Sequence, residues 1–154
     1  QEKIRIESIM NIHLAADHAG FKLKESMKGY LSKKGYSLTN HGAYKYDSSD
    51  DYPDFIFPAA KAVAKDGESR GIIFGGSGQG EAMAANRVKG IRAAVYYDGP
   101  MEIVKLSRSH NNANILSFGA RFITPEKAAE VVDMWLKEPF EGGRHKKRID
   151  KLDV

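Results

Sequence analysis

Five short runs of aliphatic and β-branched residues alternate along the chain with segments whose apolar residues recur at helical spacing. The runs predict strands at residues 11–16, 36–41, 71–75, 92–97 and 115–119. Helices are expected from Gly20 to Gly35 and at 54–65, 80–88, 100–109 and 124–137. Strands that alternate with helices are typical of βαβ units, and runs that are apolar on both faces are typical of a parallel sheet covered on each side. The sequence therefore predicts a doubly wound α/β domain.

Local signals support the helices at both ends of the chain. In the first, Leu23, Met27 and Leu31 share one stripe, whereas the lysines are expected elsewhere around the axis, at positions 22, 24, 28 and 33. Gly35 suits the C′ position that ends it. In the last, Thr124 is a plausible N-cap, Pro125 suits the first turn, and the buried face is expected to hold Val131, Val132, Trp135 and Leu136.

The 154 residues suffice for one domain with a sizeable core. No repeat or linker precedes Pro139, so residues 10–154 are expected to form that domain, with a basic C-terminal tail. Residues 1–9 are expected to be a native extension or a cloning remnant. They lack the apolar centre of a signal peptide, and no run approaches the ~18 apolar residues of a membrane span, so a cytoplasmic protein without a membrane partner is expected. The absence of cysteine excludes disulfides, thiolate nucleophiles and cysteine-bound zinc.

The segment "GGSGQGE" follows a predicted strand and opens a helix, at the sheet edge where ligands of such folds bind. Its glycines let backbone N–H groups face outward, so Gly76, Ser77, Gly78, Gln79 and Gly80 could receive an anion or an oxyanion. Tight strand-to-helix packing is the alternative. Glu81 is either a surface acid that complements the helix dipole or a base placed beside oxyanion donors, as enolisation of a carbonyl compound requires.

Two histidine motifs could move protons near neutral pH. Asp17 and His18 follow the first predicted strand, where Asp17 could also be a simple turn cap. His110 precedes the fifth strand together with Asn111 and Asn112, where a turn or capping role is the alternative.

Cationic candidates for a phosphate group lie after the fifth strand and in the tail. They are Arg121, Arg144, His145 and Arg148. Arg144 and Arg148 are four residues apart, so a helical tail would direct both guanidinium groups to one dianion, although a solvated basic tail is the alternative. Tyr52 belongs either to the core or to the ligand site.

Seven ordered motifs resemble the ribose-5-phosphate isomerase B family, which also contains allose-6-phosphate and galactose-6-phosphate isomerases. They are "DHAGFKLKE", "YPDF", "GGSGQGEAMAANR", "GIRAA", "HNNANIL", "GAR" and "FEGGRHKKRI", and they span residues 10 to about 150. The resemblance implies a Rossmann-like three-layer α/β/α fold with a five-stranded parallel sheet. It also implies a homodimer or a dimer of dimers with active sites at the subunit interface, and metal-independent, cofactor-free aldose–ketose isomerisation through an enediolate.

The resemblance also assigns roles to individual residues. Asp17 and His110 would assist ring opening, with His18 beside them, and the backbone of residues 76–80, including catalytic Ser77, would stabilise the enediolate. The phosphate would be held by Arg121, Arg144 and Arg148. Tyr52, Asn111 and Asn112 would contact the substrate.

One position departs from many family members, which carry a catalytic cysteine where this chain has Gly75. Another branch has "GGSG" at this place and a glutamate at the helix start, and the chain resembles that branch. The resemblance thus makes Glu81 the base that transfers the proton.

The predicted function is interconversion of ribose 5-phosphate and ribulose 5-phosphate, with another aldose phosphate from tetrose to hexose as the alternative. A nucleotide-binding module is disfavoured because no acidic residue ends the strand after the glycine loop, where Arg92 and Tyr97 stand at the two ends. Nucleic-acid binding is disfavoured by a net charge of only +4 and by the lack of clustered basic and aromatic motifs.

Overall fold

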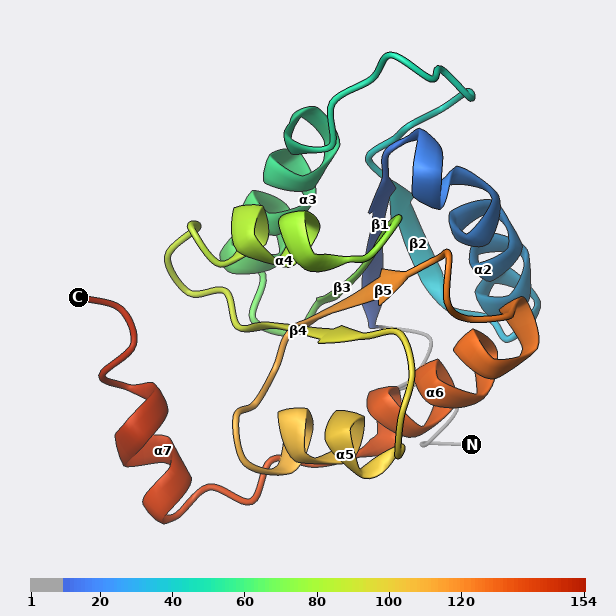
Figure 1. Cartoon of the computed structure of the whole chain (residues 1–154). Helices are drawn as coiled ribbons and strands as arrows, with labels where there is room; N and C mark the ends of the chain where they lie inside the picture. The colour runs from blue at the N-terminus through green and yellow to red at the C-terminus, as the bar shows by residue number, and fades with distance from the viewer. Residues whose placement is uncertain (1–9) are drawn as a thin grey trace.

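The computed structural model describes residues 10–154 and has three layers, with one sheet between two sets of helices (Figure 1). The strands are β1 (Asn11–Ala16), β2 (Ser37–Asn40), β3 (Arg70–Gly75), β4 (Ala93–Tyr96) and β5 (Ile115–Gly119). The helices are η1 (His18–Gly20), α2 (Phe21–Lys33), α3 (Pro53–Lys65), α4 (Gln79–Ala85), α5 (Glu102–Ser109), α6 (Pro125–Lys137) and α7 (Arg144–Ile149). None of these helices is both long and apolar enough to cross a membrane.

All five strands are parallel, in the order β2-β1-β3-β5-β4. The register pairs Gly71 with Ile115 and Gly75 with Gly119, so β3 and β5 begin and end together. One edge of the sheet therefore gathers the carboxyl ends of the strands, and the opposite edge gathers their amino ends. The predicted five-stranded parallel α/β fold is confirmed.

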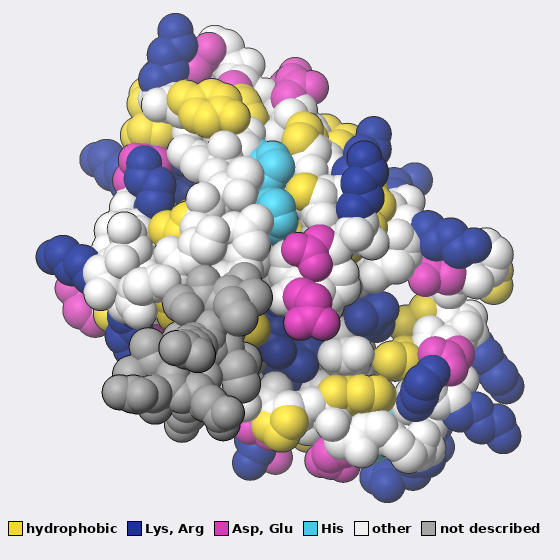
Figure 2. Space-filling model, turned by 180° about the vertical axis from the view of Figure 1, so that it is seen from behind, with side chains coloured by type: hydrophobic (Ala, Val, Ile, Leu, Met, Phe, Trp, Pro, Cys, Tyr) yellow, Lys and Arg dark blue, Asp and Glu magenta, His cyan; other side chains and the backbone are white. Residues whose placement is uncertain are grey.

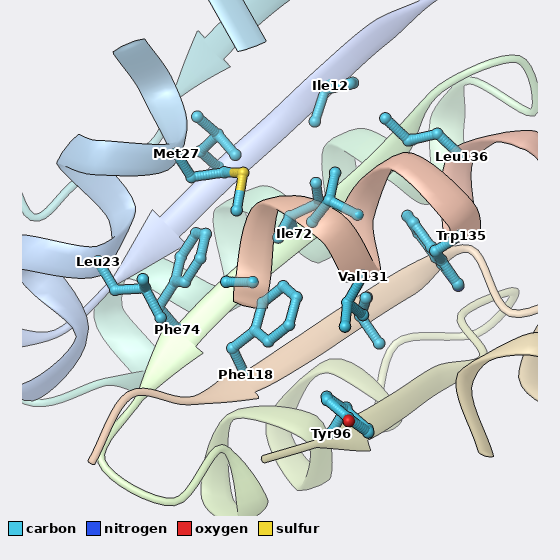
Figure 3. Packing of buried hydrophobic residues seen from close by; sticks show 14 of the residues in the cluster. Ile12, Leu23, Met27, Ile72, Phe74, Tyr96, Phe118, Val131, Trp135 and Leu136 are labelled. Carbon is cyan, nitrogen blue, oxygen red and sulfur yellow. The ribbon is translucent and has the colours of Figure 1, made fainter. Parts of the chain in front are cut away.

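Alternate residues of each central strand face opposite helical layers, as the pleat of a strand requires. Ile72 and Phe74 of β3 pack with α2 and α6 in the larger core cluster, shown in Figure 3. Ile73 of the same strand packs with α3 and α4 in a second cluster. The predicted buried face of α6 is confirmed for all four residues: Val131, Val132, Trp135 and Leu136.

The predicted helix ends are also confirmed at two positions, while one helix is shorter than expected. Gly35 adopts φ +90° directly after α2, and Thr124 caps α6 by accepting a hydrogen bond from the Lys127 N–H. The helix predicted to Val88 ends at Ala85, because the Asn86 side chain bonds both backbone groups of Ala93.

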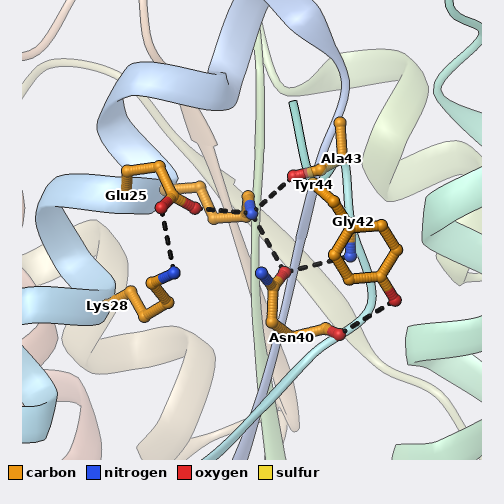
Figure 4. A network of polar contacts seen from close by, with 7 residues as sticks. Glu25, Lys28, Asn40, Gly42, Ala43 and Tyr44 are labelled. Carbon is orange, nitrogen blue, oxygen red and sulfur yellow. Dashed lines mark hydrogen bonds and ion pairs between the residues drawn. The ribbon is translucent and has the colours of Figure 1, made fainter. Parts of the chain in front are cut away.

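One lysine expected on the polar face of the first helix, Lys24, is fully buried. Figure 4 shows the polar groups of Glu25, Asn40 and Ala43 that surround its amine. The Lys24 amine donates to Glu25 Oε2 at 2.8 Å, to Asn40 Oδ1 at 2.9 Å and to the Ala43 carbonyl at 2.8 Å. These bonds compensate its desolvation, although burial still lowers its pKa. Lys24 thereby fixes the start of the loop that connects β2 to α3, a role the helical spacing did not reveal.

Candidate active site

The carboxyl edge of the sheet brings together residues from several strand-to-helix connections. We call this group the carboxyl-edge cluster: Asp17, His18, Tyr52, residues 76–80, Glu81 and Arg121. Asp17 directly follows β1, the glycine loop follows β3, and Arg121 lies just after β5. The structure thus assembles the predicted residues that come from strand ends.

Glu81 lies in the first turn of α4, and only 4% of it is exposed. Its carboxylate occupies the space that a side chain on Gly75 would need. A Cβ built on Gly75 would lie 2.0 Å from Glu81 Cδ and Oε2 and 2.2 Å from Oε1. The Glu81 carboxylate can therefore occupy this space only because residue 75, at the end of β3, has no side chain.

Burial raises the pKa of Glu81, and the charge of nearby Asp17 raises it further. A hydrogen bond from the Glu81 backbone acts in the opposite direction and is weaker than the burial effect. Burial is therefore the dominant influence on the pKa of Glu81. A carboxylate with a raised pKa is a stronger base than an exposed one.

The glycine loop is shaped by close backbone contacts. Gly78 adopts φ +79° as the N-cap of α4, and a Cβ there would lie 2.9 Å from the Phe118 carbonyl carbon. Ser117 Oγ donates to the Gly78 carbonyl at 2.7 Å, which holds the loop against β5. The tight strand-to-helix packing that was the alternative interpretation of this loop is therefore present.

Two larger side chains border this loop. The Tyr52 phenol covers Gly80, where a Cβ would lie 2.7 Å from Tyr52 Cζ. The Arg121 guanidinium lies over Gly76, with Cζ 3.1 Å from the position of a Cβ, and the Arg121 N–H bonds the Gly76 carbonyl at 3.1 Å. The backbone of Arg121 is thus fixed beside the loop, and its side chain is exposed.

Asp17 and His18 are held by local hydrogen bonds. Asp17 is buried and its Oδ1 accepts from the Gly20 N–H at 3.2 Å, so the predicted turn cap is present. His18 Nδ1 lies 2.7 Å from Asp50 Oδ1, and this hydrogen bond is the main reason why the pKa of His18 is raised.

The remaining predicted residues lie at the opposite edge, where the amino ends of the strands meet. Together with Glu141, which was not predicted, we call them the amino-edge cluster: His110, Asn111, Asn112, Glu141, Arg144, His145 and Arg148. His110 follows α5, and its ring stacks on buried His145 with centroids 4.1 Å apart. Glu141 approaches both rings, with carboxylate oxygens 3.9 Å from His110 Nε2 and 3.7 Å from His145 Nε2.

The asparagines of the amino-edge cluster differ in their surroundings. Asn111 is exposed and lines a cavity of about 440 Å³ with residues of β4 and the chain end. Asn112 adopts φ +47°, its Oδ1 accepts from Arg108 Nη1 at 2.8 Å, and its carbonyl accepts from Arg92 Nε at 2.9 Å. These bonds give Asn112 a structural role in this chain.

The tail is helical, so Arg144 and Arg148 lie one turn apart on α7, and both are exposed. Figure 1 shows α7 standing apart from the sheet at the end of an extended segment. The carboxyl and amino edges of the sheet lie roughly 15 Å apart, because the five residues of β5 each extend the strand by ~3.3 Å. Within one chain, the tail arginines and His110 therefore do not meet Glu81.

Among residues 10–154, two groups of side chains each offer three possible metal-ligand atoms within 4.8 Å of one another. One comprises His110, Glu141 and His145, but its rings are stacked 15° from parallel, so their ring nitrogens do not converge on one point. The other comprises Asp17, His18 and Asp50, whose facing atoms already bond to one another or to the backbone. We assign neither group as a metal site.

Comparison with known proteins identifies the family. The profile of the family described as Ribose/Galactose Isomerase matches residues 12–152. The chain belongs to the Ribose/Galactose Isomerase family. This membership agrees with the resemblance found in the seven sequence motifs.

Individual relatives of this family match over nearly their whole length. Ribose-5-phosphate isomerase B of Mycolicibacterium paratuberculosis is 41% identical over 144 residues, which cover 93% of this chain and 89% of the relative. The crystal structure of ribose-5-phosphate isomerase B from Mycoplasma genitalium with bound ribulose-5-phosphate superposes with a TM-score of 0.89 at 41% identity and covers 94% of both chains. The Clostridium thermocellum enzyme gives a TM-score of 0.86 at 44% identity and covers 93% of this chain and 95% of its own.

Sequence reasoning missed two acidic residues that contact the predicted histidines. Asp50 pairs with His18, and Glu141 lies between His110 and His145. Asp50 is one of several aspartates in the β2–α3 loop, and nothing in the sequence sets it apart. Glu141 lies four residues before His145, a spacing that would have suggested the contact if the helix of the tail had been extended backwards.

Proposed function

We propose that this protein interconverts ribose 5-phosphate and ribulose 5-phosphate by moving a proton between C2 and C1. The observation that carries the proposal is the buried Glu81 carboxylate in the space left by Gly75, beside a loop of backbone N–H groups. Relatives of this family that are about 40% identical over nearly the whole chain support the same activity.

The reaction begins with a sugar whose ring must open. Asp17 of one chain and His110 of a second are the proposed acid and base for that step, because both carry titratable side chains. Glu81 then removes the C2 proton, so that the C2–H bond breaks and an enediolate forms. The same carboxyl group returns the proton to C1 while the hydroxyl proton on O2 passes to O1, so that C2 becomes the carbonyl carbon and the ketose is formed.

The glycine loop lowers the barrier by stabilising the negative charge of the enediolate. Its N–H groups lie at the start of α4, where the helix dipole adds partial positive charge. One oxyanion donor typically contributes about 3 kcal/mol to a transition state. The buried base and the loop donors thus act on adjacent atoms of the substrate.

We further propose that two chains combine their edges into one site. The carboxyl-edge cluster holds the base and the loop, whereas the amino-edge cluster holds His110 and the tail arginines, roughly 15 Å away at ~3.3 Å per strand residue. A two-fold dimer could place the α7 of one chain over the carboxyl edge of its partner. Arg144 and Arg148 would then hold the phosphate together with Arg121.

The charge distribution fits a small anionic substrate better than a nucleic acid. On the face drawn in Figure 2, the described lysine and arginine side chains are scattered and interspersed with acidic ones. Nucleic-acid binding normally needs a continuous basic stripe. The exposed arginines of the two clusters suffice for one phosphate group.

A complementation assay tests the activity and the shared site together. Glu81→Gln and the Arg144→Ala/Arg148→Ala double variant should each be nearly inactive at low ribose 5-phosphate. After unfolding and refolding as a mixture, half of the dimers would be mixed and carry one intact site, so about a quarter of wild-type activity should return. No gain on mixing would contradict the shared site. Lack of turnover by the wild-type enzyme on every aldose phosphate from tetrose to hexose would contradict the isomerase itself.

A further inference from the structure

Asp50 holds His18 through two hydrogen bonds to a single oxygen. Asp50 Oδ1 accepts from the His18 backbone N–H at 2.9 Å and lies 2.7 Å from His18 Nδ1. Only 9% of the Asp50 side chain is exposed, compared with 31% of the His18 side chain. The buried partner therefore fixes the position of the more accessible one.

Asp50 is itself held firmly within the β2–α3 loop. Its N–H bonds the Asp47 carbonyl at 3.1 Å, and the Ser49 N–H bonds Asp47 Oδ1 at 2.9 Å. The start of the same loop is fastened to α2 by the buried Lys24 amine, which bonds the Ala43 carbonyl (Figure 4). The carboxylate is thus presented to His18 by a loop that is secured on both sides.

The bonds to Asp50 leave one ring nitrogen of His18 for a ligand. Within residues 10–154, His18 Nδ1 bonds Asp50, and Nε2 has no hydrogen-bond partner. When Asp50 accepts from Nδ1–H of the protonated ring, Nε2 also carries a hydrogen and can only donate. A phosphate group offers only acceptors when fully ionised, so it matches this nitrogen.

The charged groups facing His18 all favour its protonated form. Asp17 lies before it on the chain, and Asp47 and Asp50 face it from the β2–α3 loop, where Tyr46 also places a ring edge against the imidazole. The hydrogen bond to Asp50 is the largest influence and raises the pKa of His18. No cationic group is among the charges that act on His18 in the described chain.

We propose that Asp50 is a positioning residue that holds His18 as a cationic donor, with Nε2–H directed to the substrate phosphate. The inference rests on the proposed function, because it assigns His18 to the phosphate of that substrate. His18 would then supplement the arginines with a cation whose charge depends on Asp50.

Kinetics of Asp50→Asn as a function of pH test this proposal. The amide keeps the shape and an acceptor oxygen but loses the charge, so His18 should lose its proton at lower pH. KM for ribose 5-phosphate should rise on the order of 10-fold relative to wild type at pH 8, because a charge-assisted hydrogen bond is lost. The ratio should fall towards one at pH 5.5, where His18 is protonated in both enzymes, and kcat should stay within about twofold because His18 binds the phosphate in ground and transition states alike.

Asp51→Asn is the matched control, since Asp51 is the exposed neighbour and the change in charge is identical. It should leave KM at the wild-type value at both pH values. Equal effects of the two substitutions, a KM ratio that does not change with pH, or a fall in kcat at constant KM would each overturn the proposal. The last result would instead assign His18 to the reacting carbons.

Two measurements on the free protein separate this proposal from the proposed function. NMR titration of the imidazole signals should show a lower pKa for His18 in Asp50→Asn than in wild type, and no change in Asp51→Asn. Calorimetry with inorganic phosphate at pH 8 should show weaker binding to Asp50→Asn. Both results can be obtained even if ribose 5-phosphate is not turned over. An unchanged His18 titration or unchanged phosphate affinity would refute the role of Asp50.

Discussion

Replacing Gly75 by alanine should displace the Glu81 carboxylate, the proposed base, although residue 81 itself is not mutated. The new Cβ would lie 2.0 Å from Glu81 Cδ, whereas carbon atoms in contact are separated by about 3.5 Å, so the carboxylate must retreat by about 1.5 Å. A misplacement of 1 Å can cost about 100-fold in rate. We therefore expect kcat to fall at least 100-fold, while KM changes little because the phosphate contacts lie elsewhere.

The same substitution should also destabilise the protein. Overpacking of a buried site typically costs about 1–3 kcal/mol, and each kcal/mol lowers the Tm of a chain of this size by about 2–4 °C. In a Glu81→Ala background the clash is absent, so Gly75→Ala should then cost much less. Calorimetric Tm values of the four proteins in this double-mutant cycle give the coupling between the two positions.

Gly67→Ala serves as the control, because a Cβ there meets nothing within 4 Å. It should leave both kcat and Tm near the wild-type values. A Gly75→Ala enzyme with normal kcat would refute the steric placement of the base. Equal losses of Tm in the wild-type and Glu81→Ala backgrounds would show that the cost arises from contacts other than the carboxylate.

Four further predictions concern charge and protons. Glu81→Gln should lower kcat by several orders of magnitude yet raise the Tm at pH 7–8. The raised pKa of Glu81 favours the folded wild-type protein below the ordinary value of 4.5, and this stabilisation is lost as the pH rises. The Tm difference between the variant and the wild type should therefore vanish near pH 4. Gly75→Cys combined with Glu81→Ala should regain part of the activity lost in Gly75→Ala/Glu81→Ala, with a more alkaline optimum, since a thiol ionises near pH 8.5. His13 and His41 share a 2.8 Å hydrogen bond, and burial lowers the pKa of both. The unfolded chain therefore binds protons more readily than the folded one, so the urea midpoint of unfolding should fall as the pH drops below about 6.5. The fall should be smaller in His41→Asn. EDTA should not reduce initial rates, and inhibition reversed by added metal would contradict the metal-independent mechanism.

The alternation of apolar runs was sufficient to predict all five strands, because parallel strands buried on both faces have a strong signal. The spacing of Arg144 and Arg148 places them on one face if the tail is helical, and α7 supplies that helix. Boundaries were less certain where a side chain ended an element early. Asn86, which terminates α4 by bonding the backbone of Ala93, has no signature in the local sequence.

The separation of the predicted site residues into two clusters could have been anticipated from chain order alone. A residue just before a parallel strand lies at the amino edge of the sheet, and a residue just after one lies at the carboxyl edge. His110 precedes β5 and Glu81 follows β3, so their separation follows from the predicted topology. The partners of Lys24 and His18 could not be foreseen in this way, because tertiary contacts with the β2–α3 loop decide them.

The steric exchange between Gly75 and Glu81 would let the proposed base reach the same point from either of two backbone positions. The end of β3 and the first turn of α4 face each other across the glycine loop, so side chains from either element reach the same point. Only one of them can fill that space, so the Glu81 carboxylate fits there because residue 75 is glycine. The space is interior to the fold, so the carboxylate that enters it is also desolvated, which raises its pKa. The absence of a side chain at Gly75 thus sets both the position and the basicity of Glu81, while the loop donors remain unchanged.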